Sequence, residues 1–124
     1  MESIPEESGR ITFLGRKTHN ETLKEIKKSH FLILPSRNEA FGQVVIEAMT
    51  LETIPLVIRG TGSQELIEDR KTGFIGSSVE ECIEFINTLT KQEFTQLQRN
   101  LVTAVEKFDT GRWIENFKRI FIEK

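Results

Sequence analysis

The sequence has 124 residues, of which 37% are hydrophobic and 29% are charged, as expected for one ordinary soluble domain. Its 17 Lys and Arg residues against 19 Asp and Glu residues give a formal net charge of -2, which excludes the overall positive field typical of nucleic-acid-binding proteins. The longest uninterrupted apolar run, residues 31–34, is too short for a membrane span, and the acidic first residues do not resemble a signal peptide. A single cysteine, Cys82, cannot form an internal disulfide. We interpret it as a buried helix position in a reducing compartment.

Short apolar runs alternate with helical patterns over residues 10–77, which is typical of parallel βαβ units. Each expected strand ends in Gly or Pro, and the strands are 10–15, 30–35, 55–60 and the weaker 73–76. The helices expected between them are 21–28, 42–50 and 64–69. These spacers are too long for hairpins but suit right-handed crossovers. The pattern therefore predicts a three-layer α/β domain with a short parallel sheet of about four strands.

From about residue 78 to 124 the strand signals stop, and we expect C-terminal helices at 79–89, 91–107 and 112–123. Capping-box patterns support three of the helix starts, and they pair Thr18 with Glu21, Ser78 with Glu81 and Thr90 with Glu93. The last helix carries one apolar stripe, formed by Trp113, Ile114, Phe117, Ile120 and Phe121. We expect this stripe to pack within the protein, with peripheral membrane contact as the alternative. The whole chain is interpreted as a single domain.

The stretch SRNEAFGQVVIEAM, residues 36–49, begins in a loop that follows an expected strand. Ligands of open parallel sheets bind beyond the carboxyl ends of the strands. The unpaired N–H groups from about Phe41 to Val44 and the positive end of the helix dipole would suit a phosphate there. Gly42 would let a ligand approach the backbone closely, although glycine can also be present merely to permit the turn.

Glu47 lies within a helix that is apolar around most of its circumference. An unpaired carboxylate in such surroundings is costly, so we expect Glu47 to have a partner or to reach a ligand hydroxyl near the bound anion. The alternative is a narrow solvated stripe formed by Gln43, Glu47 and Thr50. Glu39 precedes the helix, where an acidic residue can simply favour the positive end of the dipole.

The segments PSRNEAFGQVVIEAM, IPLVI and QELIEDRKTGFI together resemble the donor-binding domain of family 4 glycosyltransferases, which have the GT-B fold of two Rossmann-like domains. The resemblance implies that Glu39 contacts the transferred sugar and stabilises its developing charge. It also implies that Phe41 and Gly42, with the adjoining helix start at Gln43 and Val44, offer groups to the donor. Glu47 would hold ribose hydroxyls. The implied activity is retaining transfer of a sugar from a nucleotide diphosphate to an acceptor hydroxyl, in polysaccharide or glycolipid biosynthesis.

The chain also departs from the family pattern. Thr50, Leu51 and Glu52 stand where the family usually has Ala-Cys-Gly, and the glycine-rich loop after the next strand is interrupted by Thr61. Arg16 and Lys17 form a loop that borders the nucleobase in the family, so they could contact base or phosphate, although loop cations are more often simply solvated.

Neither of the two histidines is interpreted as a site residue. We place His19 in a helix-entry loop and His30 at the start of a strand, and no cluster has metal-ligand spacing. No metal and no cofactor is expected beyond the nucleotide-sugar substrate.

The resemblance further implies that the chain is a partial GT-B donor-binding domain, with βα units over about 10–77 and a helical part over about 78–124. The N-terminal acceptor domain and the Arg and Lys that bind the diphosphate do not appear in it. We therefore expect the isolated chain to be inactive in sugar transfer and to form a homo-oligomer through uncovered apolar surface. We expect it to be cytoplasmic, at the inner face of the membrane. The alternative is a non-catalytic remnant or a nucleotide-binding or interaction module with the same fold.

Overall fold

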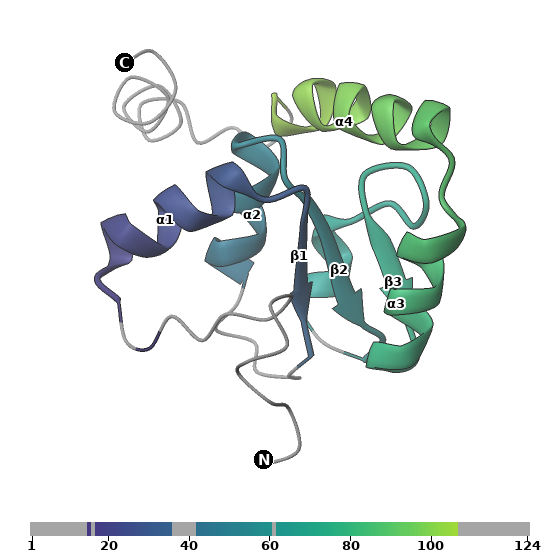
Figure 1. The fold of residues 1–124 in the computed structure, drawn as a ribbon, viewed down its shortest axis with the longest axis horizontal. Coiled ribbons are helices and arrows are strands. Elements are labelled where there is room, and N and C mark those ends of the chain that lie inside the picture. Colours follow the sequence, from purple (N-terminus) through teal and green to yellow (C-terminus); the bar gives the residue numbers. More distant parts are fainter. Residues whose placement is uncertain (1–14, 16, 36–41, 61, 107–124) are drawn as a thin grey trace, which may run out of the picture.

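The computed structural model describes residue 15 and residues 17–35, 42–60 and 62–106. These residues contain a sheet of three parallel strands, β1 (Phe31–Leu34), β2 (Ile54–Ile58) and β3 (Phe74–Gly76), in the order β1-β2-β3. The predicted α/β class and the parallel sheet are confirmed (Figure 1). The sheet has fewer strands than the four expected, because the predicted strand 10–15 lies almost entirely outside the described residues.

The central strand, β2, is buried along its whole length. Its register aligns Phe31 of β1 with Ile54, and Leu56 with Phe74 of β3. The sequence of a strand that is covered on both faces by helices is a continuous apolar run, and IPLVI is such a run. The sheet therefore positions β2 as the axis of the core, with β1 and β3 on either side.

The described helices are α1 (His19–Lys28), α2 (Gly42–Thr50), α3 (Val79–Thr88), α4 (Lys91–Val105) and the short 3₁₀ helix η3 (Gly62–Leu66). Four predicted helices are confirmed to within a few residues, whereas the predicted helix 112–123 lies outside the described residues.

The predicted helix 64–69 is wrong in type and extent. The N–H of Ile67 donates to the carbonyl of Gln64, which is the tighter bond of a 3₁₀ turn. The chain then leaves the helical path because the side chain of Thr72 accepts from the N–H of Glu68, and the Asp69 carboxylate accepts from the N–H of Ile75. These side-chain bonds offer the backbone an alternative to helix, which the sequence pattern did not show.

Two of the three capping boxes are complete. Thr18 and Thr90 each exchange hydrogen bonds with the glutamate three residues later. The hydrogen bonds between Thr18 and Glu21 lower the pKa of the Glu21 carboxyl. Ser78 forms only half of its box. Its hydroxyl accepts from the N–H of Glu81, but the Glu81 carboxylate reaches one residue further back, to the N–H of Ser77 at 2.7 Å.

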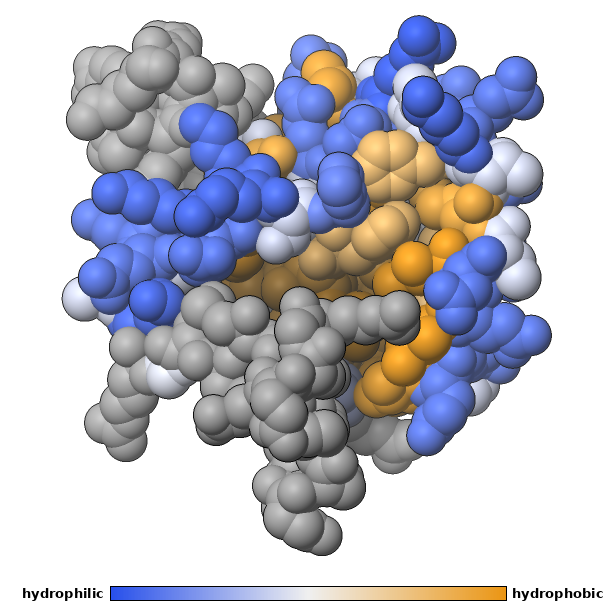
Figure 2. Space-filling view, in the orientation of Figure 1, coloured by the Kyte–Doolittle hydropathy of each residue, from blue (hydrophilic) through white to orange (hydrophobic). Residues whose placement is uncertain are grey.

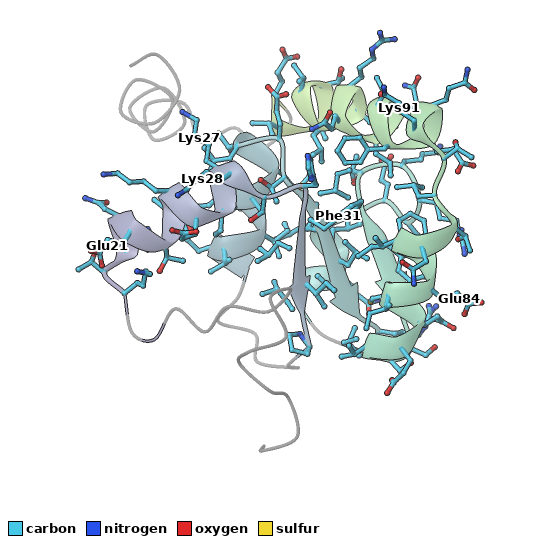
Figure 3. The ribbon with its side chains drawn as sticks, in the orientation of Figure 1. Glu21, Lys27, Lys28, Phe31, Glu84 and Lys91 are labelled. Carbon is cyan, nitrogen blue, oxygen red and sulfur yellow. The ribbon has the colours of Figure 1, made fainter. Side chains whose placement is uncertain are left out.

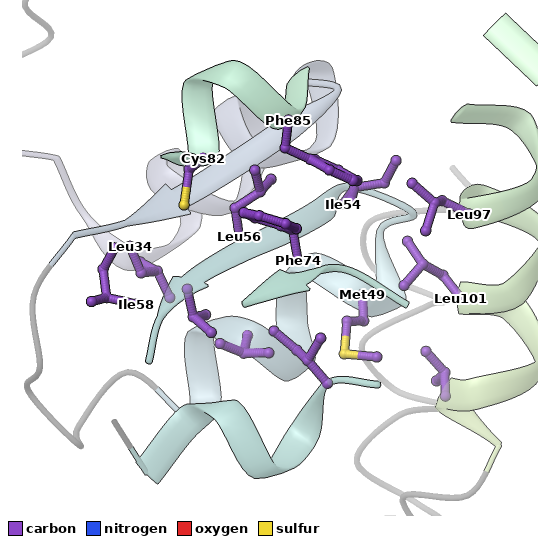
Figure 4. Close-up of a cluster of buried hydrophobic side chains, with 14 residues drawn as sticks. Leu34, Met49, Ile54, Leu56, Ile58, Phe74, Cys82, Phe85, Leu97 and Leu101 are labelled. Atoms are coloured by element: carbon purple, nitrogen blue, oxygen red, sulfur yellow. The ribbon is translucent and has the colours of Figure 1, made fainter. Parts of the chain in front are cut away.

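The main hydrophobic core lies between the sheet, α2, α3 and α4 (Figure 4). Within it the rings of Phe74 and Phe85 stack with centroids 4.3 Å apart. Cys82 is fully buried in this cluster, as its place in the helix predicted, and burial raises the pKa of its thiol. A buried, protonated thiol packs as a small apolar side chain.

A second, smaller cluster holds α1 against α2 and consists of Leu23, Ile26, Ala48 and Leu51. On the face shown in Figure 2, apolar side chains gather between the polar surfaces of α1 and α3. Phe31 lies in the middle of this face, and Ile83 of α3 is 46% exposed (Figure 3). The self-association expected from uncovered apolar surface remains a prediction.

Candidate functional site

The first turn of α2 lies at the edge of the sheet where the strands end (Figure 1). Gly42 begins this helix and is partly exposed. A Cβ added to Gly42 would meet only Leu66 Cδ1, at the ordinary contact distance of 3.8 Å. Packing against the described residues therefore does not require glycine here, and neither does the backbone, since Gly42 is helical and its φ is not positive. Close approach of a ligand is the explanation that the structure leaves for Gly42.

The carboxylate of Glu47 is buried. The residue is 3% exposed, and its Oε2 lies 2.9 Å from Nε2 of His19 in α1. A carboxylate oxygen accepts hydrogen bonds, so this contact is a hydrogen bond in the tautomer of His19 that has its proton on Nε2. The expectation that Glu47 needs a partner is confirmed.

The alternative of a solvated stripe is wrong. Thr50 is 4% exposed, and its hydroxyl donates to the carbonyl of Ile46 at 2.8 Å. Of the three residues proposed for the stripe, only Gln43 is exposed. α1, α4 and η3 all pack against α2, so only Gln43 of these three residues keeps an exposed side chain.

Sequence reasoning missed His19 as a site residue. The structure makes it the first residue of α1 rather than part of a loop, and its side chain is 64% exposed although its partner is buried. The Thr18 capping box could have placed His19 on the helix, because the residue after an N-cap is the first helical one. No local pattern links it to Glu47, since 28 positions separate the two residues.

The packing of α1 against α2 fixes the distance between His19 and Glu47. Besides the smaller apolar cluster, the hydroxyl of Thr53 donates to the carbonyl of Ile26 at 2.6 Å, at the C-terminal end of α1. Thr53 lies in the turn between α2 and β2, so this buried bond ties that turn to the C-terminal end of α1. The His19–Glu47 pair joins α1 to α2 near the start of α1.

The turn after α2 shows how the departure from the family pattern is accommodated. Glu52 has φ 64°, the N–H of Glu52 donates to Met49 and the N–H of Thr53 donates to Ala48. These bonds form a Schellman motif, in which the left-handed position usually belongs to glycine. Glu52 thus adopts a strained left-handed conformation at the position where the sequence resemblance leads us to expect glycine.

The remaining candidate residues are only partly described. Glu39, Phe41 and Arg16 lie outside the described residues. Lys17 is exposed, and Val44 is half-buried between the two apolar clusters. Gly42 and Glu47 therefore both lie on α2, and His19 of α1 contacts Glu47, whereas Val44 packs against both clusters.

The glycine-containing loop after β2 turns sharply. Gly60 has φ 95°, which favours glycine, and its N–H donates to the side chain of Gln64. Glu65 lies in η3 and is exposed. The loop leads to Leu66, whose Cδ1 lies 3.8 Å from the position that a Cβ on Gly42 would take.

Within the described ranges, no group of three or more His, Cys, Asp or Glu residues could hold a metal ion. In that part of the chain, none of the helices combines the length and apolar character needed to cross a membrane.

Comparison with known proteins identifies related sequences. Residues 6–108 match the family described as glycosyl transferases group 1. The chain is similar to the uncharacterized glycosyltransferase MJ1178 of Methanocaldococcus jannaschii, with 32% identity over 119 residues, which cover 91% of this chain and 33% of that relative. It is also similar to alpha-D-kanosaminyltransferase of Streptomyces kanamyceticus, with 37% identity over 67 residues, covering 53% of this chain and 17% of that relative. The chain thus spans one third or less of the length of these relatives.

Proposed function

The chain belongs to the glycosyl transferases group 1 family, and we propose that it is the donor-side part of a retaining glycosyltransferase. In this proposal it binds a nucleotide-diphosphate sugar, which the complete enzyme transfers to an acceptor hydroxyl in polysaccharide or glycolipid biosynthesis. The proposed location is the cytoplasm, at the inner face of the membrane.

The observation that supports this proposal best is the buried carboxylate of Glu47 on α2, the helix that begins at the carboxyl edge of the parallel sheet (Figure 1). Burial of a charge costs free energy that an apolar side chain at the same position would not. The only partner of Glu47 among the described residues is an exposed histidine. A carboxylate kept at such a cost is well suited to accept hydrogen bonds from ligand hydroxyls, and ribose presents two of them.

The start of α2 supplies the other half of the proposed donor site. During transfer the departing diphosphate gains negative charge while the sugar becomes cation-like. The N–H groups of the first turn, from Phe41 to Val44, would stabilise the diphosphate. Glu39 would face the sugar and stabilise its positive charge. Arg16 and Lys17 would border the base or the phosphates.

Glu47 can be tested by isothermal titration calorimetry. The wild-type chain and Glu47→Gln are titrated with ADP, GDP, UDP and CDP, and the best of these ligands is then compared with its 2′,3′-dideoxy analogue. Glu47→Gln should weaken the ribonucleotide by about 1–3 kcal/mol, because a charge-assisted hydrogen bond is lost, and should leave the dideoxy analogue nearly unchanged. Glu84→Gln is the matched control, since Glu84 is exposed on α3 (Figure 3).

Equal losses for the two ligands would exclude the ribose role. Transfer activity is a separate measurement, because the chain covers only part of its relatives. We expect no sugar transfer by the 124-residue chain with a radiolabelled nucleotide sugar. Robust turnover would contradict that expectation. Absence of both binding and turnover would favour a non-catalytic remnant with the same fold.

A further inference from the structure

The contact between His19 and Glu47 pairs two side chains in very different surroundings. The imidazole is 64% exposed, whereas the Glu47 side chain is 4% exposed. An ion pair or hydrogen bond that only tied α1 to α2 could form between any two surface residues of these helices. This one instead places its acceptor inside the protein, on the helix that begins at the carboxyl edge of the sheet.

The position of His19 is set by local structure rather than by the contact itself. Thr18 caps α1 through a complete capping box with Glu21, which fixes where the helix begins. Leu23 and Ile26 then pack α1 onto α2. The backbone of His19 is therefore held at one place relative to Glu47, and its ring needs to adopt only one orientation to reach Oε2.

A single donor on Oε2 restricts what the carboxylate can do. A glutamate side chain has three rotatable bonds, and burial alone does not choose the plane of its carboxylate. The bond from Nε2 fixes one oxygen and thereby the orientation of the other. Within the described part of the chain, Oε1 has no hydrogen-bond partner, so it can accept from a ligand.

We propose that His19 is a positioning residue for the donor site: it orients the Glu47 carboxylate so that this group accepts hydrogen bonds from the ribose hydroxyls of a nucleoside diphosphate. This inference rests on the proposed function, in which Glu47 binds ribose. His19 itself does not touch the ligand. Its contribution is preorganisation, which lowers the cost of ordering the carboxylate when ribose binds.

The experiment compares His19→Phe with His19→Gln in the 124-residue chain. Phe keeps a planar ring but removes the donor, whereas the amide nitrogen of Gln takes a place similar to that of Nε2 and restores it. His30→Phe is the control, because His30 is also exposed and contacts the ring of Phe94 rather than Glu47. Calorimetry measures the affinity for ADP, GDP, UDP and CDP and for the dideoxy analogue of the best ligand, and thermal unfolding is followed in parallel.

His19→Phe should weaken binding of the ribonucleotide about 3- to 10-fold, the effect of one ordinary hydrogen bond, and should leave the dideoxy analogue unchanged. His19→Gln and His30→Phe should bind both ligands like the wild type. In the Glu47→Gln background, His19→Phe should cause no further loss, because the group it orients is already altered.

Two results would overturn the proposal. If His19→Phe lowers the melting temperature but changes the affinities for both ligands equally, the pair is only a structural tether between the helices. If His19→Gln folds normally but lacks the wild-type preference for the ribonucleotide over its dideoxy analogue, donation of a hydrogen bond to Oε2 is not the role of His19. These results leave Glu47 as a ribose ligand, whereas a wild-type chain that binds none of the four nucleotides removes the proposed function and this inference together.

Discussion

Helices α2 and α4 pack against each other in the same core, yet they bury different kinds of side chain. The inner face of α4 is formed by Leu97, Leu101 and Val105, which recur every four residues. The inner surface of α2 includes Glu47 and Thr50 beside its apolar residues. Regular helical spacing of apolar residues explains α4 completely.

The difference shows where packing ceases to be a sufficient explanation. Thr50 is satisfied within its own helix, so its burial costs little. Glu47 depends on a side chain from another helix, and an apolar residue would fill its place at lower cost. Positions that break a local rule without a gain in packing are expected at functional sites. The burial of α4 is therefore explained by stability alone, whereas that of Glu47 on α2 supports the proposal that α2 takes part in binding.

The largest expected effect is on the purely structural helix. Leu101→Ala should lower the free energy of unfolding by about 2–5 kcal/mol, because it leaves a cavity at a fully buried position. Val102→Ala is the control, since the neighbouring Val102 is 50% exposed and should change stability by less than about 0.5 kcal/mol. Urea unfolding followed by circular dichroism measures both variants. A loss below 1 kcal/mol for Leu101→Ala would mean that α4 is not anchored as described.

Glu47→Leu should raise the free energy of unfolding, in contrast to Leu101→Ala. Replacing the buried carboxylate by an apolar side chain removes its desolvation cost and leaves only an exposed histidine without its partner, so the chain should gain about 1–2 kcal/mol of stability. Nucleotide binding should be lost. Urea unfolding measures the stability of Glu47→Leu, with Glu84→Leu as the control at an exposed position. A destabilised Glu47→Leu protein would show that the carboxylate serves the fold.

Gly42→Ala tests whether the first residue of α2 serves stability or ligand binding. Alanine should stabilise the helix by about 0.5–1 kcal/mol, because its Cβ has room beside Leu66. If a ligand approaches the backbone at Gly42, affinity for nucleoside diphosphate should fall in calorimetry. Gly73→Ala provides the contrast, since a Cβ there would collide with the carbonyl oxygen of Pro55 and should destabilise the protein. Unchanged affinity for Gly42→Ala would rule out close approach of a ligand to the backbone at this glycine.

The smallest expected effect concerns the end of α2. Glu52→Gly should stabilise the chain by about 0.5 kcal/mol, because glycine adopts the left-handed conformation without the steric penalty of a Cβ but loses more entropy on folding. Thermal unfolding measures the change, and Glu106→Gly serves as the comparison. Glu106 follows α4 with φ -64°, so glycine there should not stabilise. A less stable Glu52→Gly protein would show that the glutamate side chain contributes a contact.

Sequence patterns alone predicted the elements whose signals are local. The helices α1, α3 and α4 follow from apolar spacing and from Thr18, Ser78 and Thr90 as caps, since each cap acts within one turn of helix. The strand predicted at 55–60 from its apolar run is present as β2, shifted to 54–58. The requirement that Glu47 have a partner followed from its apolar neighbours. Each of these inferences uses residues at most a few positions apart.

Only the tertiary structure decided which residue meets Glu47. His19 lies 28 positions away, and its contact depends on how α1 packs across α2 through side chains that are themselves far apart in sequence. The short η3 and the strained Glu52 are similar cases, because their backbone conformations are imposed by hydrogen bonds and connections to neighbouring elements rather than by the preferences of their own residues. Local preferences amount to a fraction of a kcal/mol per residue, and packing of whole elements outweighs them.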